Sequence, residues 1–72
     1  MYIAIFQNQN ECVKVHSLLK KRGVKSDIIA TPRKYLRSGS CSYCLRFNSN
    51  DIDKVRSNAK YAGIPILAIY KL

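Results

Sequence analysis

Hydrophobic and polar residues divide the chain into six segments. Four of them are short and either apolar or alternating, as is typical of β-strands: residues 2–6, 24–31, 41–47 and 64–70. In residues 11–22 and 52–62 the apolar positions instead recur every three or four residues, which predicts two amphipathic helices. The predicted order of elements is therefore β-α-β-β-α-β.

Signals that begin and end helices support these two assignments. Asn8 or Asn10 precedes the first helical segment and can cap it, and Asp51 stands at the start of the second. Gly23 and Gly63 follow the two segments, at the position where glycine commonly ends a helix.

The order of elements predicts an α+β, ferredoxin-like fold: a four-stranded antiparallel sheet with both helices on one face. In this fold the fourth strand lies at an edge, which suits Pro65 because proline cannot donate to a strand ladder. We expect residues 1–72 to form a single ferredoxin-like domain. Since so small a domain buries only about 60% of its unfolded surface, a shallow surface site is favoured over a deep catalytic cavity.

The chain is strongly basic, with 13 Lys and Arg against four Asp and Glu and a net charge of +9. This charge attracts nucleic acid, acidic proteins or small anions without choosing among them. The apolar start is too short for a secretory signal, and no apolar run approaches the roughly 20 residues of a membrane span. We therefore expect a cytoplasmic protein without membrane contact, in which the three cysteines are reduced.

Residues 31–47 hold the candidate chemistry. Cys41 stands at the start of the predicted third strand, and four cationic residues lie near it in sequence: Arg33, Lys34, Arg37 and Arg46. Neighbouring cations lower the pKa of a thiol, and the thiolate is the reactive form. Cys41 is thus a candidate reactive cysteine. The alternative, that it is the first inward-facing residue of a strand, is equally open because buried cysteine is common.

Cys41 and Cys44 also form a C-x-x-C motif, which is typical of redox exchange or metal binding. In an extended strand such residues lie roughly 10 Å apart on opposite faces, whereas a disulfide needs Cα atoms within about 7 Å. A redox pair therefore requires Cys41 to lie in the loop, and Cys44 is a candidate accessory thiol. The opposed faces also argue against a zinc site formed by these two residues with Cys12 and His16, so we expect no metal.

Motifs of common enzymes are absent from the sequence. It has one histidine and no P-loop, dinucleotide-binding glycine motif or zinc-protease motif, and its four acidic residues form no obvious catalytic pair. These absences favour a protein that is not an enzyme, and we expect no cofactor.

Four short motifs, with the spacing between them, resemble one known family. They are Thr31-Pro32-Arg33, Ser40-Cys41, Leu45-Arg46-Phe47 and Ile69-Tyr70-Lys71. Over nearly the whole chain the sequence resembles the putative selenium/sulfur carrier protein-like family of bacterial and archaeal domains. Members commonly have glycine in place of Ser42 and a small apolar residue in place of Cys44, so the C-x-x-C motif is not carried over from the family.

The resemblance implies that Cys41 carries sulfur or selenium as a persulfide or selenosulfide. Such a carrier needs a thiolate that attacks a donor and later releases the outer atom. Its partners would be donor and acceptor proteins for sulfur or selenium. Arg33 and Arg46 would stabilise the anion, since arginine is always charged and rich in donors.

The neighbouring cations Lys34 and Arg37 would add to this support, and Thr31 would fix the direction in which the chain enters the basic loop. For Arg46 the alternative is a solvated position on the open face of the sheet.

Two other functions remain open at this point. A basic ferredoxin-like sheet can bind nucleic acid by stacking bases on exposed aromatic residues, although Tyr43 and Phe47 fall with Leu45 on the face that we expect to be buried. A regulatory or assembly module that forms a homodimer through an edge strand is the third alternative, and it rests on analogy of fold alone.

Overall fold

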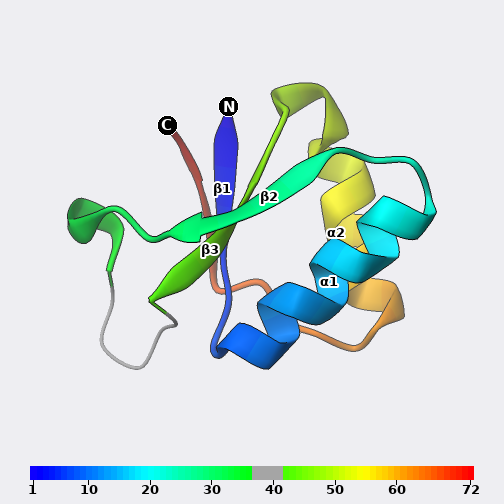
Figure 1. Cartoon of the computed structure of the whole chain (residues 1–72), viewed down its shortest axis with the longest axis horizontal. Helices are drawn as coiled ribbons and strands as arrows, with labels where there is room; N and C mark the ends of the chain where they lie inside the picture. Colours follow the sequence, from blue (N-terminus) through cyan, green and yellow to red (C-terminus); the bar gives the residue numbers. More distant parts are fainter. Residues whose placement is uncertain (37–41) are drawn as a thin grey trace.

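The computed structural model describes residues 1–36 and 42–72, so the predictions for Arg37 and Cys41 lie outside the described residues. Its elements are β1 (Tyr2–Ile5), α1 (Gln9–Lys21), β2 (Ser26–Ala30), η1 (Arg33–Tyr35), β3 (Tyr43–Phe47), η2 (Ser49–Asp51), α2 (Ile52–Tyr61) and β4 (Ala68–Lys71) (Figure 1). This order confirms the predicted α+β, ferredoxin-like fold.

The four strands form one antiparallel sheet in the order β2-β3-β1-β4. β4 lies at an edge, as predicted, but it begins at Ala68 and not at residue 64. Pro65 therefore precedes the strand, and Leu67 makes the first backbone bond to β1, donating to the Ile5 carbonyl over 2.8 Å. At the other end of the sheet the two chain termini lie side by side, joined by a bond from the Leu72 amide to the Met1 carbonyl.

Three of the four helix ends follow the signals in the sequence, whereas Asp51 stands at the N-cap of α2 without a capping hydrogen bond from its side chain. The Asn8 side chain accepts a hydrogen bond of 2.9 Å from the Glu11 amide, which caps α1. Gly23 and Gly63 have φ angles of +75° and +70°, in the left-handed region that glycine occupies without strain. These glycines let the chain leave each helix and turn back toward the sheet.

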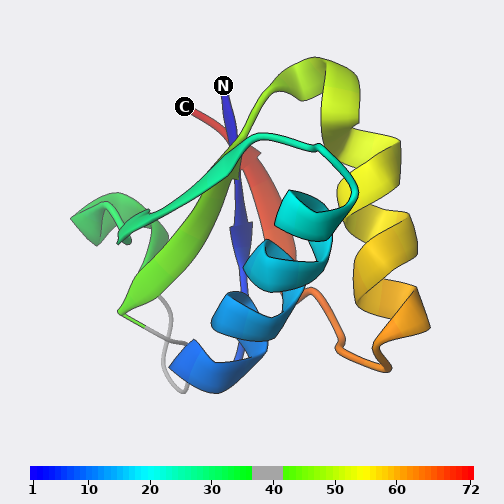
Figure 2. The same ribbon diagram turned by 45° about the vertical axis from the view of Figure 1, so that its right-hand side comes forward.

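Both helices cover one face of the sheet (Figure 2). The core on this side consists of Ala4, Phe6, Cys12, Val15, Leu19, Val24, Leu45, Phe47, Val55, Ala59 and Ile64. Burial of such apolar surface contributes roughly 25 cal/mol per Å² to stability. Cys12 is fully buried here, which confirms its interpretation as a small core residue.

The opposite face, which carries no α-helix, is also partly buried. Two rows of residues cross it from β2 to β4: first Ile29, Cys44, Ile5 and Ala68, then Asp27, Arg46, Ile3 and Tyr70. Ile3, Ile5 and Cys44 are completely buried in a second apolar cluster, to which Tyr35 of η1 belongs. Figure 2 shows η1 on the side of the sheet away from α1 and α2. We call this the helix-free face.

Candidate functional site

The connection between β2 and β3, which contains the predicted site, is held together where it leaves and rejoins the sheet. The Thr31 amide donates to the Ser42 carbonyl over 2.7 Å, one step beyond the last pair of the ladder, Ala30 and Tyr43. Thr31 itself is buried. Its part in directing the chain stays a prediction. Ser42 is the residue that follows Cys41 in the sequence.

Two of the predicted cations lie on η1, the short turn that begins directly after Pro32. Backbone bonds from Tyr35 to Pro32 and from Leu36 to Arg33 close the turn. Arg33 and Lys34 are both exposed on it. Arg33–Tyr35 therefore form a 3-10 turn at the start of the segment that the sequence predicts to be a basic loop.

Tyr35 anchors η1 across the helix-free face. Its ring stacks on that of Tyr70, with centroids 4.4 Å apart and planes 16° from parallel. Its hydroxyl donates to the Lys71 carbonyl over 3.1 Å. β2 and β4 are the two edges of the sheet, so this turn reaches from one edge to the other. The signal in the sequence is the pair Tyr35 and Leu36, bulky residues inside a basic segment.

Arg46, predicted to support the thiolate, is bound elsewhere. Its Nη2 donates to Asp27 Oδ2 over 2.9 Å, and the two residues are direct neighbours across β2 and β3. Arg46 lies four residues beyond Ser42, about 13 Å along an extended strand. Because Asp27 partly balances its charge, Arg46 is less suited than Arg33 or Lys34 to act near Ser42. Its role toward Cys41 stays a prediction.

Cys44, the candidate accessory thiol, is sealed within the second apolar cluster, with Ile3 and Ile5 as fully buried neighbours. Ile29, Tyr35, Ala68 and Tyr70 pack against this cluster, so a reagent reaches the buried sulfur only when this packing opens. In this setting Cys44 fills the place of a small apolar residue. Whether it assists Cys41 stays a prediction.

Of the four residues counted as zinc ligands, the three that the structure describes do not lie together. Cys12 belongs to the core under the helices and Cys44 to the cluster on the other face. His16 Nδ1 lies 2.8 Å from Ser26 Oγ, with which it forms a hydrogen bond. In residues 1–36 and 42–72, no three His, Cys, Asp or Glu residues are grouped so that they could hold a metal ion.

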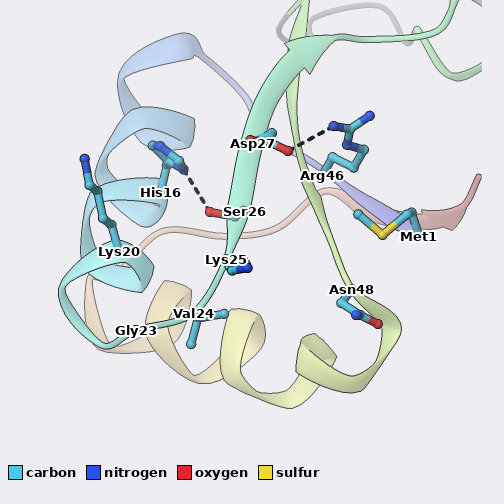
Figure 3. A pocket seen from close by; sticks show the side chains of 10 residues that line it. All are labelled: Met1, His16, Lys20, Gly23, Val24, Lys25, Ser26, Asp27, Arg46 and Asn48. Atoms are coloured by element: carbon cyan, nitrogen blue, oxygen red, sulfur yellow. Dashed lines mark hydrogen bonds and ion pairs between the residues drawn. The ribbon is translucent and has the colours of Figure 1, made fainter.

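A surface hollow of about 640 Å³ lies at the first half of β2 and was not predicted from the sequence (Figure 3). His16 and Lys20 approach it from α1, and Asp27 and Arg46 from the sheet. Thr31 and Ser42 lie at the other end of β2, so the hollow is separate from these two residues that flank the Cys41 segment.

The central strands offer no aromatic platform for bases on the helix-free face. Within described β1 and β3, the residues on this face are Ile3, Ile5, Cys44 and Arg46. Tyr43 lies toward the other face, and it is 44% exposed where burial was expected, because it stands at the end of β3. Nothing in this arrangement favours RNA-like base stacking.

The model of the family described as "Putative Se/S carrier protein-like" matches residues 1–71. Neither the curated proteins nor the solved structures give a significant match. In the described part of the chain, neither helix is long and apolar enough to cross a membrane. The family match covers nearly every residue and agrees with the motifs around Cys41. The chain belongs to the Se/S carrier protein-like family.

Proposed function

We propose that this protein carries sulfur or selenium on Cys41 and exchanges it with donor and acceptor proteins. The observation that carries the proposal is the family match over residues 1–71. The exposed basic turn beside the Cys41 segment supports it, since a carrier must hold and hand over an anionic sulfur or selenium atom. The absence of enzyme motifs from the sequence agrees with a carrier that acts together with other proteins.

The loading step is a thiolate exchange. The Cys41 thiolate attacks the outer sulfur of a donor persulfide, forms a new S–S bond and breaks the donor's S–S bond. The donor leaves as a thiolate, and Cys41 becomes a persulfide. A selenosulfide donor reacts in the same way at its outer selenium. Release is the reverse reaction with an acceptor thiolate, so the cycle needs no external oxidant or reductant.

Positive charge is the physical requirement of this cycle, because both the attacking thiolate and the bound persulfide are anions. Arg33 and Lys34 provide such charge on an exposed turn that leads into the Cys41 segment. Arg37 provides another in sequence, and the net charge of +9 adds a general attraction for anions. We assign the support of the Cys41 anion mainly to these residues, with a smaller share for Arg46.

The pKa of Cys41 tests this requirement. Alkylation rates measured against pH, with the modified cysteine located by mass spectrometry, should give a pKa below the ordinary value of about 8.5. The double variant Arg33→Gln/Lys34→Gln should raise it, whereas Lys25→Gln/Lys60→Gln, which removes equal charge at exposed positions away from η1, should change it little. A Cys41 pKa at or above about 8.5 would remove the physical basis of the proposal.

Loading tests the chemistry itself. Incubation with a small-molecule persulfide should add the mass of one sulfur atom to the peptide that contains Cys41, and a reductant should remove it. Cys41→Ser should abolish this addition, whereas Cys44→Ala should retain it. Addition at Cys44 or Cys12 with Cys41 unmodified would contradict the assignment.

A further inference from the structure

The outer surface of the two helices contains a small apolar hollow of about 380 Å³. Val13 and Leu18 of α1 line it on one side, and Tyr61 and Ala62 at the end of α2 line it on the other. Tyr61 is 75% exposed and Val13 is 39% exposed, so the Tyr61 ring and the Val13 methyl groups face solvent instead of the core. We call this feature the interhelical groove.

Cations border this apolar floor. Lys14 and Lys21 line the interhelical groove from α1, and the Arg22 guanidinium lies 5.2 Å from the centre of the Tyr61 ring. None of the described residues that line the groove is acidic. The cation–π contact also limits the freedom of the Tyr61 ring, which lowers the entropy lost when a partner packs against it.

We propose that the interhelical groove binds an acidic amphipathic segment of another protein. An apolar side chain of that segment would pack between Leu18 and Tyr61, and its carboxylates would lie near Lys14 and Lys21. Exposed apolar surface rimmed by polar groups marks interaction sites, and helices commonly lay an apolar face into such grooves. Complementary charge would speed encounter and select acidic partners.

Two other occupants fit the surface less well. A second copy of this chain would bring another +9 of charge to a basic surface, which opposes self-association. An anionic membrane suits the lysines, but binding to a bilayer needs apolar side chains that protrude from a helix face, whereas here they line a hollow between two helices. An inserted side chain from a protein fills this shape better.

The groove and the basic turn lie on opposite sides of the sheet, since α1 and α2 cover one face and η1 the other (Figure 2). A partner bound at the interhelical groove would therefore leave Arg33 and Lys34 exposed. The inference does not depend on the chemistry of Cys41, and it holds or fails on binding alone.

A titration of the ¹⁵N-labelled full chain tests the inference. The probe is a synthetic peptide with leucines at helical spacing and glutamates at the other positions, and the control peptide has the same composition in scrambled order. We expect saturable amide shifts at Val13, Leu18 and Tyr61 with the amphipathic peptide, and only weak, dispersed shifts with the scrambled one.

Variants locate the binding energy. Tyr61→Ala and Lys14→Glu/Lys21→Glu should each weaken peptide binding by about tenfold or more, as expected for a central aromatic anchor and its flanking charges. The matched control Lys25→Glu/Lys71→Glu changes the net charge equally at other exposed sites and should weaken binding by less than about threefold. All substituted residues are exposed, so the variants should fold, which circular dichroism checks.

Several outcomes would overturn the inference. Equal losses in the two charge variants would show general attraction between opposite charges, and shifts that avoid the groove would place binding elsewhere. If dilution of the protein alone changes the same amide signals at the groove, and light scattering gives the mass of a dimer, the surface would be assigned to self-association. If vesicles made of a mixture of phosphatidylcholine and phosphatidylserine produce the same shifts as the peptide, the surface would be assigned to membrane binding.

Discussion

The two faces of the sheet are closed by very different means. On one face, helices of 13 and 10 residues cover a core whose buried residues come from both helices, the central strands and the helix-ending turns. On the helix-free face, the described residues that pack against Ile3, Ile5 and Cys44 are Ile29, Ala68 and the stacked pair Tyr35 and Tyr70, with Tyr35 on a turn of three residues. Side chains on both faces reach complete burial. Complete burial therefore does not imply an equally stable cover.

This difference predicts two levels of stability. Segments with few buried contacts open locally at a lower free energy than the cooperative core. The helix side should therefore determine global unfolding, while the cover over the helix-free face should open on its own. That cover runs directly into the segment of Cys41, so its opening would also change the surroundings of the proposed site.

Phe47→Ala should have the largest effect, because Phe47 is fully buried under the helices. Removing a buried phenylalanine costs about 3–5 kcal/mol, most of the stability of a small domain. Urea denaturation followed by circular dichroism should show a protein that is largely unfolded at 25 °C. Ile3→Ala on the helix-free face should cost less, about 2 kcal/mol, since the tyrosine cover can settle into the space. Equal losses would remove the distinction between the faces.

The two cysteines at Cys12 and Cys44 compare the faces directly, because each is fully buried on a different one. In native conditions Cys44 should be alkylated at least about tenfold faster than Cys12, which corresponds to a difference of about 1.4 kcal/mol in opening free energy. Peptide mapping by mass spectrometry separates the two rates. Tyr35→Ala should speed the reaction of Cys44 and leave that of Cys12 nearly unchanged.

Equal alkylation rates at the two positions, both following global stability in urea, would show a single cooperative unit. In that case the helix-free face would be as firmly closed as the helix side, and the cover could not regulate access to its thiol.

The sequence predicted the helix side well, because this side depends on local patterns. The spacing of Val15 and Leu19 and the alternation of Leu45 and Phe47 assign inward positions without knowledge of the rest of the fold. The Asn8 side chain caps an amide three residues away, and the two glycines act through their own backbone. The helix ends therefore follow from nearby residues alone.

The helix-free face was harder to predict, because it depends on contacts between distant residues. Tyr35 stacks on Tyr70 and binds Lys71, and neither partner is evident before the strand order is known. The pairing of Arg46 with Asp27 likewise requires the register of β2 and β3. The sequence placed cations near Cys41 by their position in the chain, but it could not say which of them another residue already binds.

A double-mutant cycle on Tyr35 and Tyr70 should measure how the cover is held. The stacked rings should give a coupling free energy of about 0.5–1.5 kcal/mol from denaturation of Tyr35→Ala, Tyr70→Ala and the double variant. Tyr35→Phe should keep the stacking and lose only the bond to the Lys71 carbonyl, at a cost of about 0.5–1 kcal/mol. Additive losses in the double variant would mean that the stack contributes nothing beyond burial of each ring.

The ion pair between Asp27 and Arg46 should give the smallest effect, although it lies on the same helix-free face. The pair lies on β2 and β3, in the same row across the sheet as Ile3 of β1 and Tyr70 of β4. The Asp27 side chain is 62% exposed and that of Arg46 is 38% exposed, so water screens the pair. Asp27→Asn should therefore destabilise the protein by only about 0.2–1 kcal/mol, and salt should reduce the difference.

A loss this small would show that water reaches the ion pair. The buried part of the helix-free face would then be the part near Tyr35 and Tyr70. A loss above about 2 kcal/mol, unchanged by salt, would instead indicate a desolvated pair and a closed layer that extends to the edge strand β2. The same measurement bears on Arg46 as a support for the thiolate. If Asp27→Asn releases the guanidinium to act near Cys41, the pKa of the Cys41 thiol should fall, whereas an unchanged pKa would leave that support to Arg33 and Lys34.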